Sequence, residues 1–135
     1  MILAVCLDDQ NGMAFNRRRQ SQDRAAREKL LELTGGAPLW MNDYSAKQFG
    51  GAANVRVDGD FLEKAGQGEY CFAEFPPLAP WAGRAERILV IRWNRVYPAD
   101  AKLDIPLKAP LWRLVKSEEF TGSSHETLTL EVYER

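Results

Sequence analysis

The chain has 135 residues, of which 45% are hydrophobic and 27% charged, and its net charge is −1. This composition is typical of one soluble globular domain, residues 1–135, and excludes a disordered chain. The balanced charge argues against a dedicated nucleic-acid binder, and no apolar run approaches the roughly 20 residues that cross a bilayer. Because the first ten residues lack a basic segment and soon turn acidic, they predict a strand rather than a signal peptide, and we expect a cytoplasmic protein.

The first half of the chain alternates short apolar runs with helical patterns. Residues 2–7 predict a buried strand, and residues 13–20 predict a loop. Ser21 is the expected N-cap of a helix over residues 22–34, with Asp23 in its first turn and two glycines after its end. The remaining elements of this half are expected as strands at 38–41 and 55–57 and short helices at 44–49 and 61–65.

The second half contains the strongest strand patterns. Strands are expected at 70–75 and 87–94, separated by a proline-rich turn or short helix near 79–83. Residues 112–116 and 127–133 both read as strands, and the turn signal at 122–124 makes them an antiparallel hairpin. The sequence therefore predicts an α/β fold with a mostly parallel central sheet, flanked by helices and closed by a C-terminal antiparallel hairpin.

Histidine and cysteine are too few for common catalytic or metal sites. One histidine and two separated cysteines cannot form a zinc site, and both cysteines lie in apolar runs that predict buried thiols. His125 lies in the turn of the hairpin, where we expect it to be solvated. Ser21 and Ser123 have no histidine and carboxylate nearby in the sequence, so nothing here predicts nucleophilic catalysis.

Several segments of the chain resemble dihydrofolate reductase and occur in that family's order. They are ILAVCLDDQNGMAFN, LTGGAPLWMNDYSAKQF, EYCFAEF, RILVIRWNRVYPAD and the C-terminal LWRLVKSEEF…LEVYER. The resemblance covers almost the whole chain and implies that family's fold, with one strand near residues 50–58 missing. It also implies where that family's substrate and cofactor residues should lie.

At those positions the chain departs from the family pattern. Ala26 stands where the resemblance places the acid that protonates substrate, and Asn42 to Ser45 replace the segment that binds the cofactor's phosphate. Phe75-Pro76 replaces the glycine pair that lets backbone approach the pyrophosphate. We therefore expect a divergent member of this fold without folate reductase activity, with no cofactor and no resident metal.

The edge of the sheet beyond its strands is the expected ligand site. Arg17, Arg18 and Arg19 form the only basic run and stand just before a helix, where an anion is favoured. These arginines and their polar neighbours predict binding of a small anionic ligand or nucleotide. The expected ligand-binding residues are Asn16, Arg17, Arg18, Arg19, Gln20, Asn42, Asp43, Tyr44, Ser45 and Glu74.

Other interpretations stay open at this point. In one, the arginine run is a solvated loop paired with Asp8, Asp9 or Asp43. In another, the chain is an NADPH-dependent reductase in which Asp23 serves as a displaced catalytic acid. In a third, it is a protein-interaction module or homodimer that uses the sheet edge exposed by the missing strand.

Overall fold

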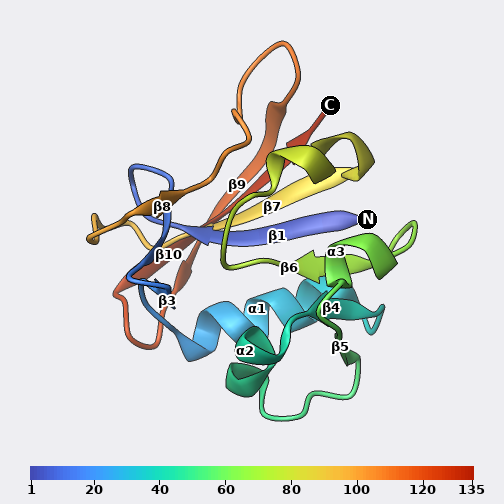
Figure 1. The fold of residues 1–135 in the computed structure, drawn as a ribbon. Helices are drawn as coiled ribbons and strands as arrows, with labels where there is room; N and C mark the ends of the chain where they lie inside the picture. Colours follow the sequence, from blue (N-terminus) through green and yellow to red (C-terminus); the bar gives the residue numbers. More distant parts are fainter.

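The computed structural model describes all of residues 1–135 and shows an α/β fold around a seven-stranded sheet (Figure 1). In spatial order its strands are β5 (Val55–Val57), β4 (Leu39–Met41), β6 (Tyr70–Phe72), β1 (Ile2–Leu7), β7 (Arg87–Arg92), β10 (Thr127–Glu134) and β9 (Arg113–Thr121). The first five are parallel, whereas β10 is antiparallel to both β7 and β9. The predicted mostly parallel sheet and C-terminal hairpin are therefore confirmed.

Alternation along the central strands gives the sheet one apolar core on each face. Leu3 and Val5 of β1 belong to a cluster of 17 buried residues, whereas Ile2 and Ala4 belong to a cluster of 15 on the opposite face. Both faces of β1 are thus covered. This explains why residues 2–7 are apolar throughout instead of alternating with polar residues.

Helices cover the two faces unequally. The 15-residue cluster packs against α1 (Arg24–Thr34) and the turn η1 (Lys47–Phe49), which follows α2 (Asp43–Ala46). The other face is covered by α3 (Phe61–Lys64), by η2 (Ala79–Arg84) and by long loops. In Figure 1, α1 is the longest helix and lies beneath β1 and β6. No helix has the length and apolar character needed to cross a membrane.

The segment predicted as a loop at residues 13–20 is instead a β-hairpin, so that expectation was wrong. Strands β2 (Gly12–Phe15) and β3 (Arg18–Arg19) pair antiparallel, and β8 (Ala101–Lys102) adds a third strand. The turn residues Asn16 and Arg17 have φ of 53° and 62°. Tight two-residue hairpin turns require positive φ values, which the sequence usually marks with a glycine. Arginine stands at that position here, so the sequence did not predict a turn.

The helix beginnings partly match the expected caps. Asn42 caps α2, as expected, because its side chain accepts a hydrogen bond from the Ser45 backbone N–H at 2.8 Å. Ser21 was the wrong N-cap for α1, since the cap is Asp23, whose carboxylate accepts from the backbone N–H groups of Ala25 and Ala26. The true cap lies two residues after Ser21 in the chain. Its carboxylate also contacts residues far from the helix in the sequence.

Candidate functional site

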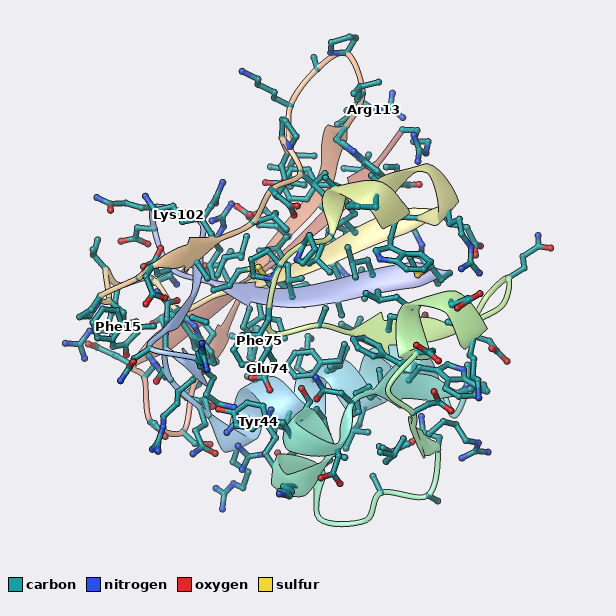
Figure 2. All side chains as sticks on the ribbon, viewed as in Figure 1. Phe15, Tyr44, Glu74, Phe75, Lys102 and Arg113 are labelled. Atoms are coloured by element: carbon teal, nitrogen blue, oxygen red, sulfur yellow. The ribbon has the colours of Figure 1, made fainter.

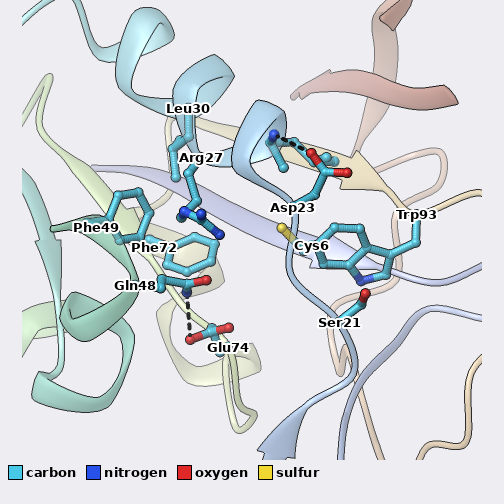
Figure 3. Close-up of a pocket in the computed structure, with 12 residues that line it drawn as sticks. Cys6, Ser21, Asp23, Arg27, Leu30, Gln48, Phe49, Phe72, Glu74 and Trp93 are labelled. Carbon is cyan, nitrogen blue, oxygen red and sulfur yellow. Dashed lines mark hydrogen bonds between the residues drawn. The ribbon is translucent and has the colours of Figure 1, made fainter. Parts of the chain in front are cut away.

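A narrow pocket lies between α1 and the sheet, and we call it the α1 pocket (Figure 3). Its walls are largely apolar, with Leu30, Phe49, Phe72, Ile91 and Trp93 among them. The cavity volume is about 20 Å³, so in this conformation it holds little more than one water molecule. The polar side chains that line it are those of Ser21, Asp23, Arg27, Gln48 and Glu74.

Glu74 forms one end of the α1 pocket and is buried, with only 9% of the residue exposed. Arg19 binds it with two hydrogen bonds, from Nε at 2.8 Å and from a terminal nitrogen at 3.0 Å. The Ser45 hydroxyl donates at 2.8 Å and the Gln48 amide at 3.2 Å. The charge of Glu74 is therefore neutralised by one guanidinium and solvated by two further side chains.

Arg19 binds Glu74 but does not itself line the α1 pocket. Its guanidinium lies 4.2 Å from the centre of the Tyr44 ring, and its backbone N–H donates to the Tyr44 hydroxyl. Figure 2 shows Tyr44, Glu74 and Phe75 gathered at this edge. Burial lowers the pKa of Arg19, but the hydrogen bonds and charge of Glu74 outweigh it and raise that pKa.

The structure brings together only part of the predicted ligand site. Arg19, Tyr44, Ser45 and Glu74 are in mutual contact, but Arg19 pairs with Glu74 and not with the aspartates considered as its partners. The other predicted residues lie elsewhere. Asn16, Arg17 and Arg18 are exposed on the β2–β3 hairpin, Gln20 donates to Asp8 at 2.9 Å, Asn42 caps α2, and Asp43 is exposed with Lys47 at 3.7 Å.

Asp23 is at the other end of the pocket and joins two distant segments. Its carboxylate is 2% exposed and accepts from the backbone N–H groups of Ala25 and Ala26 in α1. It also accepts from the N–H groups of Ser123, Ser124 and His125 in the β9–β10 turn, at 2.8–3.0 Å. Burial raises the pKa of Asp23, but these donors stabilise the carboxylate so strongly that its pKa falls well below the ordinary value.

His125 is buried and not solvated as expected, since only 7% of it is exposed. Its Nδ1 lies 3.0 Å from Asp23 Oδ2, and its ring stacks on Trp93 with centroids 4.8 Å apart. Its Nε2 faces two hydroxyls, those of Tyr97 at 2.8 Å and Ser21 at 3.2 Å. The expectation that Ser21 lacks a histidine and a carboxylate was therefore also wrong.

Arg27 is a pocket residue that the sequence interpretation missed. It lies on α1, is partly buried and lines the α1 pocket, yet its guanidinium has no salt bridge or hydrogen bond within the chain. Figure 3 shows it pointing into the pocket beside Phe72. Helical periodicity offered a signal, because residue 27 shares a face of α1 with Asp23 and Leu30.

Two further residues that line the pocket supply neither a catalytic acid nor a thiolate nucleophile. Ala26, where the resemblance places a catalytic acid, lines the pocket and is 4% exposed, so only a methyl group stands there. Cys6 also lines the pocket, but burial, reinforced by the charges of Glu74 and Asp23, raises its thiol pKa far above the ordinary value. Cys6 is therefore a neutral thiol and not a thiolate nucleophile at physiological pH.

No group of three or more histidine, cysteine, aspartate or glutamate side chains is arranged to hold a metal ion. No protein-family model matches the chain, and no curated protein matches it. The functional argument therefore depends on the charges and geometry of the α1 pocket.

Proposed function

We propose that the protein is a divergent dihydrofolate-reductase-like domain that binds a small anionic ligand in the α1 pocket. Arg27 is the group that recognises the anion, and the polar groups at the pocket's two ends limit what can enter. The ligand carries a carboxylate or phosphate on a small organic group, as many nucleotides and cytoplasmic metabolites do. Folate reduction is not part of the proposal.

The observation that carries this proposal is the unpaired guanidinium of Arg27 in a largely apolar pocket. No guanidinium nitrogen of Arg27 is buried, so all of them can be reached by a ligand that enters from the solvent. A carboxylate or phosphate would form two parallel hydrogen bonds with this guanidinium. Arg19, which binds the carboxylate at the Glu74 end, does not line the pocket and is already paired.

The narrowness of the pocket indicates how the ligand binds. A cavity of about 20 Å³ admits only a small group without movement of its walls. The Glu74 end can widen, since Arg19, Ser45 and Gln48 all reach Glu74 through side chains, which can change rotamer without movement of the backbone. The exposed Arg17 and Arg18 on the adjoining hairpin would then add positive charge near a ligand that extends outward.

The two alternatives have less support from the geometry. A reductase that uses Asp23 as its acid requires a proton on a carboxylate whose donors hold it ionised. Phe75 also stands where the resemblance to dihydrofolate reductase implies a glycine for the cofactor, and its ring packs 5.5 Å from that of Tyr44. A homodimer through the edge strand β5 has only the exposed Val57 in its favour, at 52% exposure.

Calorimetric titration tests the proposal with a panel of inorganic phosphate, nucleoside monophosphates, small dicarboxylates and NADPH. We expect at least one phosphate or carboxylate compound to bind, and Arg27→Ala to weaken its binding about tenfold or more, since hydrogen bonds to charged groups contribute about 1.5–3 kcal/mol. Arg24→Ala is the matched control, because this substitution removes the same charge from the exposed side of the same helix.

Two results would reject the proposal. The first is a panel with no binding at millimolar concentration, and the second is equal weakening by Arg27→Ala and Arg24→Ala. Binding of NADPH alone, unaffected by Arg27→Ala, would support the reductase alternative. Sedimentation of the free protein as a dimer would support the homodimer alternative.

A further inference from the structure

Ser21, His125 and Asp23 form a hydrogen-bonded chain that ends in the α1 pocket. Asp23 Oδ2 lies 3.0 Å from His125 Nδ1, and His125 Nε2 lies 3.2 Å from Ser21 Oγ. Ser21 precedes α1, whereas His125 lies in the β9–β10 turn, so only the fold brings them together. A hydroxyl, an imidazole and a carboxylate in this order are the components of an activated serine nucleophile.

Asp23 determines which nitrogen of His125 carries a proton. The carboxylate is ionised and can only accept, so Nδ1 must donate to it. In the neutral imidazole, Nε2 then carries the lone pair, which faces the hydroxyls of Ser21 and Tyr97. The five backbone N–H donors around Asp23 and the stacked Trp93 ring hold this geometry in place. Asp23 is therefore a positioning residue for His125.

Tyr97 competes with Ser21 for His125. Both hydroxyls face Nε2, at 2.8 Å for Tyr97 and 3.2 Å for Ser21, but one lone pair accepts one strong hydrogen bond at a time. The shorter contact favours Tyr97. The serine is consequently held in a weakly activated state, and removal of the Tyr97 hydroxyl should increase its reactivity.

The pocket beyond Ser21 is apolar and very small. Ser21 lines the α1 pocket together with the apolar side chains of Leu30, Phe72 and Ile91. The guanidinium of Arg27 lines the same small pocket and adds a positive charge to it. These features favour a carboxylic ester with a very small acyl group, whose alcohol faces the solvent.

We infer that Ser21 is the nucleophile of an ester-hydrolysing site, with His125 as its general base. Ser21 Oγ attacks the ester carbonyl carbon while its proton passes to His125 Nε2. The carbon–oxygen bond to the alcohol then breaks, and the alcohol leaves with that proton. Water attacks the acyl-serine, gives its proton to Nε2 and releases the carboxylic acid, and the returning proton restores the Ser21 hydroxyl.

A neutral fluorophosphonate tests this inference on the full-length protein. Its phosphorus forms a bond to an activated serine oxygen and loses fluoride, and intact mass spectrometry counts the adducts. We expect one adduct on the native protein, none on Ser21→Ala, and an unchanged adduct on Ser123→Ala. Ser123 is the matched control, because it lies in the same turn as His125 but has no contact with the imidazole.

Two further variants separate catalysis from a structural role. We expect Tyr97→Phe to speed labelling about fivefold, the factor expected when one neutral hydrogen bond no longer competes. Asp23→Asn keeps one of the two acceptor oxygens for the backbone donors but removes the carboxylate that orients His125. We expect it to slow labelling about tenfold or more while circular dichroism shows an intact fold.

Several outcomes would overturn the inference. They are the absence of an adduct on both the native protein and Tyr97→Phe, an adduct that persists in Ser21→Ala, and a Tyr97→Phe protein that reacts no faster than native. This inference shares the pocket of the proposed function but is tested separately, since the reagent is uncharged. Loss of anion binding with intact labelling would reject only the proposed function, and the reverse result only this inference.

Discussion

The two ends of the α1 pocket each bury a carboxylate, but they hold it by different means. Glu74 is bound by the side chains of Arg19, Ser45 and Gln48. Asp23 is bound by five backbone N–H groups, from α1 and from the β9–β10 turn, and by His125. Side chains can rotate away without moving the chain, whereas backbone donors cannot.

This difference assigns separate roles to the two ends. The Glu74 end can rearrange to admit a ligand at the cost of a few hydrogen bonds. The Asp23 end ties the start of α1 to a turn about 100 residues further along the chain, so a change there loosens the fold itself. Substitutions at the Asp23 end should therefore lower the free energy of unfolding more than substitutions at the Glu74 end.

The largest expected effect is that of Asp23→Ala on the free energy of unfolding. The change removes the α1 cap and leaves the buried N–H of His125 and its neighbours without acceptors, which we expect to cost about 3–4 kcal/mol in total. Urea denaturation measures it. Asp43→Ala is the control, because Asp43 is exposed and its loss should hardly change the free energy of unfolding. A cost below about 1 kcal/mol would show that the two segments hold together without this carboxylate.

A smaller loss is expected at the other end. Arg19→Ala leaves the Glu74 carboxylate buried with only neutral donors, and we expect a destabilisation of about 2 kcal/mol in urea. Adding Glu74→Gln should recover part of this loss, because the remaining side chain is then uncharged. Arg18→Ala, at the exposed neighbouring position, serves as the control. Failure of Glu74→Gln to recover any stability would contradict the buried-charge explanation.

The smallest effect concerns pH. The pKa of Asp23 is lower in the folded state than the ordinary value of about 3.9, so its contribution to stability is complete above about pH 4 and is lost as the pH falls further. We expect a loss of about 1 kcal/mol between pH 5 and pH 3 that is absent in Asp23→Asn. Urea denaturation at several pH values gives the free energy of unfolding of both the native protein and Asp23→Asn. The same pH dependence in the two proteins would show that Asp23 is not the group responsible.

Elements with a strong local pattern could be predicted from the sequence. The apolar run at 2–7, the helix of Ala26 and Leu30 with Gly35 at its end, and the C-terminal hairpin all appear in the structure. Of the candidate site, the contact among Arg19, Tyr44, Ser45 and Glu74 follows from the expected arrangement of strand ends. Each of these depends on residues near one another in the chain or on the order of parallel strands.

Only the tertiary structure decided which polar groups meet. The turn of the β2–β3 hairpin consists of Asn16 and Arg17, and an arginine does not predict the positive φ that Arg17 adopts. Asp23 looked like a helix acid and His125 like a solvated turn residue, yet the two are hydrogen-bonded and buried. The physical reason is that periodicity reports which side of an element is apolar, whereas a polar contact across about 100 residues depends on how the elements pack and leaves no local pattern in the chain.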